Sequence, residues 1–206
     1  MSTEAAVERS AKRRSELVLA AYELFVGKGY RNVAVADIVA RAGVSHGTFY
    51  NYFDNKRDIL DAVIDHYYAL IGERVIGPDT EAPTTLDEFC AMFGRAVDRC
   101  FALVESEPGL VNFILLEVSS IDDRVIHRSV ENMGAYGDAA RERIRDGIAR
   151  GFLDPDLDPR IAGEVMLSVI LSALLSAMRG DADGLSQQRV TAELTAFIRA
   201  AFAPEP

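Results

Sequence analysis

Hydrogen-bonding side chains without a carboxylate are concentrated in residues 46–51. The segment follows Gly43, which ends an apolar-periodic stretch, and Ser45, which is a good N-cap for a new helix. Each residue of a helix is rotated by about 100° from the one before it, so four residues of this helix share an arc of roughly 140°, and Phe49 and Phe53 lie outside it. The residues on the arc are His46, Gly47, Tyr50 and Asn51. We expect the two phenylalanines to be buried and the arc to face outward, as in a helix that enters the major groove of DNA.

Charge is unevenly distributed along the chain. Residues 1–60 carry nine Lys/Arg and seven Asp/Glu, a balance of +2, whereas the remaining residues carry 13 and 25. The net charge of −10 therefore belongs to the later part of the chain. We expect an acidic body that repels DNA and a small head to which DNA contact is confined.

The elements that position this segment are predicted to be helices. The 206 residues are enough for a substantial core, and no run of alternating β-branched residues is present. The sequence predicts an all-α fold of about nine helices. Their expected positions are 14–27, 35–42, the segment after Ser45, 56–75, 85–105, 110–119, 122–150, 159–179 and 185–202.

Several classes of protein are disfavoured by what the sequence lacks. No apolar run reaches the roughly 18–20 residues that cross a bilayer, and the N-terminus has no secretory signal. We find no metal-ligand spacing, nucleophile elbow or phosphate-binding loop. Cys90 and Cys100 lie ten residues apart on one predicted helix, on different faces, which excludes an intrachain disulfide. We expect a cytoplasmic protein with buried, reduced thiols, which is not an enzyme and has no cofactor, no metal site and no membrane contact.

An ordered constellation of residues between positions 14 and 60 adds a resemblance to a known family. It comprises Ala20-Ala21, Leu24-Phe25, Gly29-Tyr30, Ile38, Ala42-Gly43-Val44-Ser45, Gly47-Thr48, Tyr50, Phe53 and Lys56. With these residues the segment resembles the TetR family of bacterial transcriptional regulators. The resemblance implies a homodimer bound to double-stranded operator DNA of palindromic sequence, usually as a repressor that a small-molecule effector releases.

The resemblance also implies which residues contact DNA. They are His46, Gly47, Thr48, Tyr50, Asn51, Tyr52 and Lys56. We expect His46 and Asn51 to read base edges, because an Asn amide makes a bidentate contact to adenine. Thr48, Tyr50 and Lys56 match positions that hold phosphates, while Tyr52 stands where many members have His, which leaves it between phosphate contact and packing.

The chain departs from the family pattern at the start of the second helix. Val33-Ala34 stands where members usually have Thr, so a hydroxyl N-cap worth about 1 kcal/mol is missing. Asp37 is expected to complement the positive end of the helix instead.

The resemblance implies four segments along the chain. Residues 1–13 are expected to form a flexible arm, residues 14–55 a helix-turn-helix head, residues 56–77 a connecting helix, and residues 78–206 a body for ligand binding and dimerisation. Glycine and proline around positions 77–83 mark the last boundary.

Aromatic and aliphatic residues of the predicted body indicate an apolar effector, such as an acyl chain or a hydrophobic drug. Asn112, Glu117 and His127 are the expected polar anchors. For any single residue, packing into the core is the alternative interpretation. The predicted lining consists of Phe89, Phe93, Phe101, Asn112, Phe113, Leu116, Glu117, His127, Met133 and Tyr136.

The last two predicted helices are expected to form the dimer interface. The helix from Ile161 is apolar nearly all round and contains small residues that allow close approach, so it must be covered. We predict a four-helix arrangement with the partner's copies. Its interface residues are Ile161, Val165, Ser168, Val169, Ser172, Leu175, Ser176, Leu194, Phe197 and Ile198.

Two alternatives stay open at this point. One is a ligand-binding or enzymatic helical bundle whose DNA head is vestigial. The other is an activator or a regulator that needs no ligand, since the sign of control depends on where the operator lies.

Overall fold

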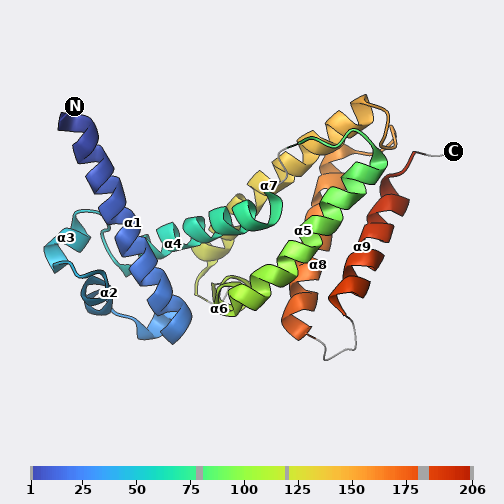
Figure 1. Cartoon of the computed structure of the whole chain (residues 1–206). Helices are drawn as coiled ribbons and strands as arrows, with labels where there is room; N and C mark the ends of the chain where they lie inside the picture. The colour runs from blue at the N-terminus through green and yellow to red at the C-terminus, as the bar shows by residue number, and fades with distance from the viewer. Residues whose placement is uncertain (1, 78–80, 119–120, 181–185, 205–206) are drawn as a thin grey trace. The chain divides into compact units, whose positions relative to one another are not determined.

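A computed structural model describes residues 2–77, 81–118, 121–180 and 186–204. Within these ranges every regular element is helical, which confirms the all-α prediction. The α-helices (Figure 1) are α1 (Ser2–Lys28), α2 (Val35–Ala42), α3 (His46–Tyr50), α4 (Lys56–Ile71), α5 (Leu86–Ser106), α6 (Pro108–Asn112), α7 (Asp123–Ala149), α8 (Pro159–Arg179) and α9 (Gln187–Phe202).

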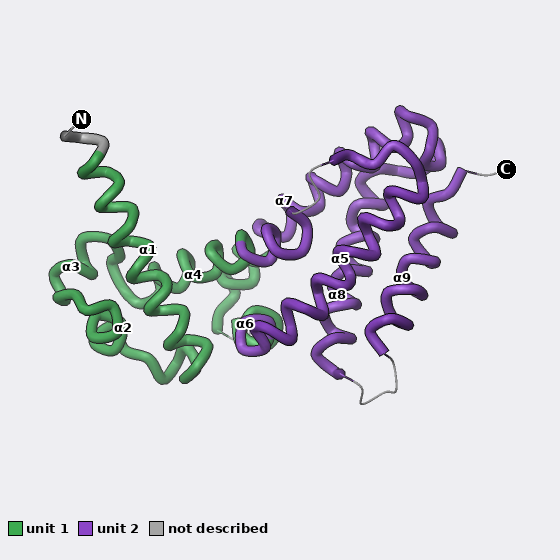
Figure 2. Tube along the Cα trace, viewed as in Figure 1, with its two compact units in different colours: residues 1–69, 112–129 green, residues 70–111, 130–206 purple. Residues whose placement is uncertain are grey.

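The chain divides into two compact units (Figure 2). Unit 1 comprises residues 1–69 and 112–129, and unit 2 comprises residues 70–111 and 130–206. Helix α4 therefore supplies most of its length to unit 1 and its last residues to unit 2. The placement of residues 112–129 with the head is a feature that the sequence-based division did not contain.

Unit 1 is built on α1, which packs against α2 and against a 3-10 turn over Tyr30–Asn32. Leu17, Ala21 and Phe25 recur at four-residue spacing on α1 and are fully buried, as an amphipathic core helix requires. The Phe25 ring stacks on that of Phe113 with centroids 6.4 Å apart, so the second segment of the unit completes this core.

Unit 2 is a helical bundle in which α5 packs along both α8 and α9 (Figure 1). Close approach between α7 and α8 depends on Gly163. A Cβ atom there would lie 3.2 Å from the carbonyl oxygen of Gly137, so a larger residue would push the two helices apart. At one end of the bundle, Phe89 packs against the rings of Phe152 and Phe202, with centroids 6.4 and 6.0 Å away.

Several element bounds differ from those predicted. Helix α1 begins at Ser2, so residues 2–13 are its first turns rather than an arm, because Ala, Glu, Lys and Arg favour helix without an apolar face. The predicted helix 56–75 ends at Ile71 and continues as a π-helical turn over Gly72–Ile76, and Phe113–Glu117 forms a second one. Position 119 and the predicted start at 185 lie outside the described residues.

Both cysteines are buried free thiols, as predicted. Burial raises the pKa of Cys90, and it raises the pKa of Cys100 to about 12. These thiols therefore stay protonated at neutral pH.

Helix α8 is long and apolar enough to cross a membrane by length and composition, which corrects the expectation that no segment reaches this length. The stretch of α8 that reaches this length is interrupted by Glu164 and three serines. Only 33% of that stretch is buried within the chain.

Candidate nucleic-acid interface and effector cavity

The turn between α2 and α3 has the geometry that its sequence predicts. Gly43 adopts the left-handed conformation with φ 65° and ψ 34°, which a residue with a Cβ disfavours. Ser45 is the N-cap of α3, and its Oγ accepts a hydrogen bond of 3.1 Å from the Thr48 amide. The hydroxyls of these two residues lie 3.0 Å apart. The turn thereby fixes where α3 begins.

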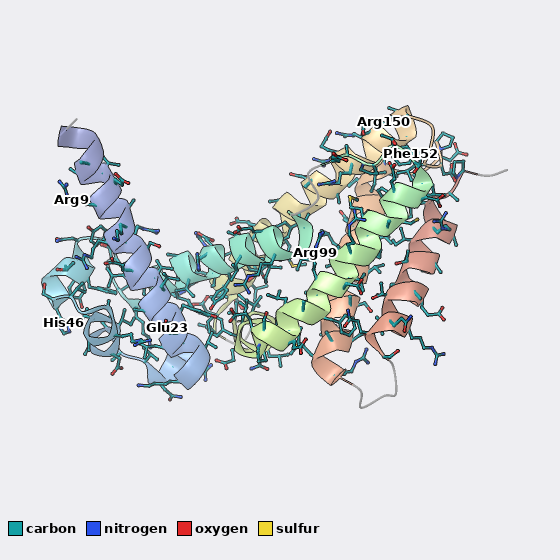
Figure 3. All side chains as sticks on the ribbon, in the orientation of Figure 1. Arg9, Glu23, His46, Arg99, Arg150 and Phe152 are labelled. Atoms are coloured by element: carbon teal, nitrogen blue, oxygen red, sulfur yellow. The ribbon has the colours of Figure 1, made fainter. Side chains whose placement is uncertain are left out.

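Helix α3 separates a buried from an exposed face as predicted. Phe49 and Phe53 are 0% and 2% exposed and pack with ring centroids 5.7 Å apart. The Arg14 guanidinium of α1 lies 5.0 Å above the Phe53 ring, which fastens this anchor to the first helix. The face that points outward carries His46, Gly47, Tyr50 and Asn51. Figure 3 shows His46 on the outer side of α3.

Lys56 is held by the protein itself. Its Nζ donates hydrogen bonds to the carbonyl oxygens of Tyr30 at 2.9 Å and Val33 at 2.7 Å, and it lies 4.3 Å from the centroid of the Tyr30 ring. Desolvation lowers the pKa of Lys56. This ammonium closes the turn that precedes α2, so its geometry is that of a positioning group rather than of a side chain extended toward phosphate.

The start of α2 replaces the missing hydroxyl with a carboxylate. Ala34 makes no side-chain cap, and Asp37 Oδ2 instead accepts a hydrogen bond of 2.8 Å from the Ala34 amide. A negative group in the first turn also complements the helix dipole. The departure from the family pattern therefore leaves the geometry of α2 intact.

A basic stripe on α1 belongs to the same surface and was missed by the sequence reasoning. Arg9, Lys12 and Arg13 line a hollow together with Thr48 and Tyr52. Ser10 Oγ lies 3.5 Å from the Tyr52 hydroxyl across this hollow. Figure 3 shows Arg9 projecting from the N-terminal part of α1. The i, i+3, i+4 spacing of these three cations would have indicated a shared helical face. It was not used because residues 1–13 were expected to form a flexible arm.

Arg57 fastens the two segments of unit 1 to each other. Its guanidinium pairs with Asp61 and, at 3.0 Å, with Asp122. The Val125 amide also donates to the Asp122 carboxylate at 2.9 Å. This amide, followed by Arg57, holds the pKa of Asp122 below its usual value. Arg57 is therefore a structural cation of the head.

Unit 2 encloses a small apolar cavity of about 60 Å³ between α5, α7 and α8. Its walls are apolar apart from Tyr136 and Arg143 of α7. Of the ten predicted pocket residues, Phe93 and Tyr136 line this cavity. The complete lining is Ile76, Met92, Phe93, Ala96, Tyr136, Ala139, Ala140, Arg143, Met166, Leu167 and Ile170.

The remaining eight predicted pocket residues lie elsewhere. Phe89 is fully buried against Phe152 and Phe202, and Phe113 belongs to the core of unit 1. Met133 borders a separate hollow on α7 and α8. None of the three expected polar anchors lines the cavity, since all of them belong to unit 1. The residues outside the cavity are Phe89, Phe101, Asn112, Phe113, Leu116, Glu117, His127 and Met133.

An apolar stripe on α8 and α9 is exposed in the single chain. Ile161 is 61%, Leu175 43% and Phe197 54% exposed, values that are high for large apolar side chains. Ser168 and Ser172 are exposed between them, while Val165, Ser176 and Leu194 are half-buried. Val169 and Ile198 are buried within the chain, so their side chains are already covered and the predicted interface narrows to the other eight residues.

Comparison with known proteins agrees with this architecture. Residues 17–63 match the model of the bacterial regulatory proteins of the tetR family. The transcriptional activator FasR of Mycolicibacterium smegmatis is 38% identical over 96 residues, which cover 47% of this chain and 42% of FasR. The transcriptional repressor KstR2 of the same species is 26% identical over 151 residues, covering 71% of this chain and 72% of KstR2.

A solved structure shares the fold over nearly the whole chain. It is the transcriptional regulator FadR from Bacillus subtilis in complex with stearoyl-CoA, with a TM-score of 0.71, 21% identity and coverage of 91% of this chain and 98% of that one. In the match to FasR, the chain spans less than half of that relative's length.

A left-handed glycine turn, a capped short helix on a phenylalanine anchor and a following helical body define a helix-turn-helix protein. The family match assigns residues 17–63 to the bacterial regulatory proteins of the tetR family, and the fold shared with FadR extends over 91% of the chain.

Proposed function

We propose that this protein is a transcriptional repressor that binds a palindromic DNA operator as a homodimer and is released by an apolar small molecule. The observation that carries the proposal is the exposed face of α3, which presents hydrogen-bonding groups and no carboxylate on a helix fixed by a capped turn. Such a helix suits the major groove, where base edges offer distinct donor and acceptor patterns.

Two groups of residues are assigned different roles at the DNA. His46 and Asn51 are exposed on α3 and are proposed to read base edges. Thr48, Tyr50 and Tyr52 are proposed to hold phosphates, supported by the basic stripe of α1 that shares a hollow with Thr48 and Tyr52. Gly47 gives the backbone room to approach DNA. Lys56 is assigned to positioning the turn before α2 because its ammonium is already hydrogen-bonded there.

Dimerisation is proposed to proceed through the exposed stripe of α8 and α9. A helix that is apolar over its length but only one-third buried leaves a surface that water solvates poorly. A second copy of the same stripe covers it in a two-fold arrangement, because an isologous interface presents the same patch from both chains. Two recognition helices then fit half-sites about one helical turn of DNA apart.

The effector is proposed to bind in the cavity of unit 2. Its walls are almost entirely apolar, and two of them carry Met92 and Met166, whose flexible side chains adapt to a ligand. FadR, which shares the fold, has been solved with stearoyl-CoA, which supports an effector with a long apolar part. Ligand that fits one conformation better than the DNA-bound one lowers DNA affinity by linkage.

Selection of bound fragments from random duplex DNA tests the proposal. We expect enrichment of an inverted repeat, followed by release of the bound duplex when an apolar ligand from a metabolite panel is added. Release is measured by fluorescence anisotropy of a labelled duplex. Recovery of no preferred sequence, with tight ligand binding retained, would contradict the proposal and favour a ligand-binding bundle with a vestigial head.

A further inference from the structure

Arg143 is an unusual side chain in the wall of the unit 2 cavity. The guanidinium carries five N–H donors. Among the described residues it has one hydrogen-bond partner, the sulfur of Met92 at 3.2 Å, and a thioether is a weak acceptor. Arg143 is half-buried and lines a cavity whose other walls are apolar apart from Tyr136. Most of its hydrogen-bonding capacity is thus available to a ligand at the cavity.

The spacing of the α7 residues gives the cavity two ends. Tyr136, Ala139, Ala140 and Arg143 follow each other at i, i+3, i+4 and i+7, so they share one helical face, and all four line the cavity. Two small alanines lie in the middle, and the polar residues are about 10 Å apart along the axis. A ligand that lies along this face therefore has an apolar floor and a cation at one end.

We propose that the effector is an amphiphile with an anionic head group, whose head pairs with Arg143 and whose apolar tail enters the cavity over Ala139 and Ala140. This inference deepens the proposed function, since it takes the same cavity as the effector site. A carboxylate matches the fork of a guanidinium, and in a half-buried site such a charge-assisted pair outweighs a neutral contact.

The cavity of about 60 Å³ is smaller than an extended alkyl tail, so binding requires the walls to move. Met92 and Met166 are the walls that adapt most readily, because an unbranched thioether side chain has many accessible conformations. Displacing Met92 also removes the present partner of Arg143 and leaves the guanidinium for the ligand head. Entry of the tail and capture of the head are therefore coupled.

Calorimetric titration of the full-length protein at neutral pH, without DNA, tests this inference. The probes are octanoate, dodecanoate and hexadecanoate, their matching primary alcohols, and the matching trimethylammonium cations. We expect at least one carboxylate to bind about tenfold or more tightly than its alcohol, and the cation to bind most weakly. An alcohol that binds as tightly as its carboxylate, or a series in which no carboxylate binds, overturns the inference.

Variants at two arginines of α7 locate the effect. Arg143→Met is expected to weaken the carboxylate about tenfold and to leave the alcohol unchanged, while Arg143→Lys keeps part of the preference. Arg145→Met is the matched control, because Arg145 lies on the same helix, pairs with Glu142 and does not line the cavity. Persistence of the full preference in Arg143→Met overturns the inference. If that variant fails to fold, the comparison of carboxylate and alcohol binding to the wild-type protein still tests the inference.

Failure of this inference differs from failure of the proposed function. Release of operator DNA by neutral and anionic ligands alike would leave the regulator in place and remove the role of Arg143. A clear preference for carboxylates in a protein that selects no DNA sequence would support the role of Arg143 and contradict the proposed function.

Discussion

Asn51 lies at the end of α3, where its backbone is still helical and its side chain is exposed. An amide at this position has both a donor and an acceptor to offer, whereas Phe49 and Phe53 beneath it have neither. The base-reading role proposed for Asn51 therefore uses a short side chain on a helix that two buried rings anchor, and removing that side chain leaves the anchor intact.

Asn51→Ala is expected to weaken binding to the selected operator by about 1–3 kcal/mol while leaving binding to random DNA unchanged. The reason is that a bidentate contact to adenine contributes only at the correct base pair. Anisotropy titrations against both duplexes measure the two affinities. Equal losses on operator and random DNA would contradict the assignment of Asn51 to base reading.

The cations of α1 are proposed to contact DNA through charge instead. Arg9→Gln and Lys12→Gln are each expected to weaken operator and random DNA alike and to reduce the salt slope of binding by about 1, because each removes one phosphate contact. The control is Arg150→Gln, a cation of unit 2 paired with Asp146 (Figure 3). An unchanged slope in both α1 variants would show that the stripe lies away from the DNA backbone.

At the scale of elements, the positions where sequence reasoning succeeded share a local cause. The bounds of α2 and α8 follow from Gly43 and from Asp158-Pro159, whose backbone preferences act within a few residues. The start of α1 was missed because its first turns carry no apolar periodicity. The π-helical turn Gly72–Ile76 and the cavity wall both depend on packing between helices that are far apart in the sequence. The spacing of residues along the chain does not predict such packing.

Gly72 joins the end of α4 to the cavity through Tyr136. A Cβ atom at Gly72 would lie 2.7 Å from the Tyr136 ring, so Gly72→Ala must displace a side chain that lines the cavity. We expect a loss of about 1–3 kcal/mol in the free energy of unfolding and a changed effector affinity. Urea denaturation and ligand titration measure these effects.

Gly134→Ala is the matched control on α7. Nothing lies within 4 Å of its Cβ position, so alanine should stabilise the helix by about 0.5–1 kcal/mol. Similar effects of the two substitutions would refute the role of Tyr136 as the neighbour that restricts Gly72.

The link between the two segments of unit 1 should respond to acid. The pKa of Asp122 lies below its ordinary value of 3.8, because the Val125 amide and then Arg57 favour the carboxylate. Its stabilising contribution is fully present above that ordinary value and is lost as the pH falls through the lower, folded-state pKa. Asp122→Asn should therefore destabilise the protein at neutral pH, with a difference from wild type that vanishes in acid.

Thermal unfolding at a series of pH values measures this difference. Asp123→Asn removes the neighbouring carboxylate, which has no hydrogen bond or ion pair with other described residues, and serves as the control. A constant difference between Asp122→Asn and wild type across the acid range would rule out the Arg57–Asp122 link as its origin.

At the scale of the whole molecule, we propose that the exposed stripe of α8 and α9 determines the oligomeric state. Leu175→Glu places a charge on a surface that a second copy must desolvate, so we expect the wild type to sediment as a dimer and the variant to shift to monomer. Val7→Glu makes a similar change at a 64% exposed position of α1 and should leave the dimer intact. A wild-type monomer at micromolar concentration would refute the interface.

The two inert thiols have a practical consequence for following this protein in motion. Cys90 and Cys100 are 1% and 0% exposed and stay protonated, so we expect thiol-directed dyes and spin labels not to react with them at neutral pH. A single cysteine introduced on the exposed face of α3 is then the one reactive site in each chain. The natural sequence therefore needs no cysteine removed before labelling, and in the proposed dimer the distance between the two α3 helices can be measured spectroscopically with and without the proposed effector.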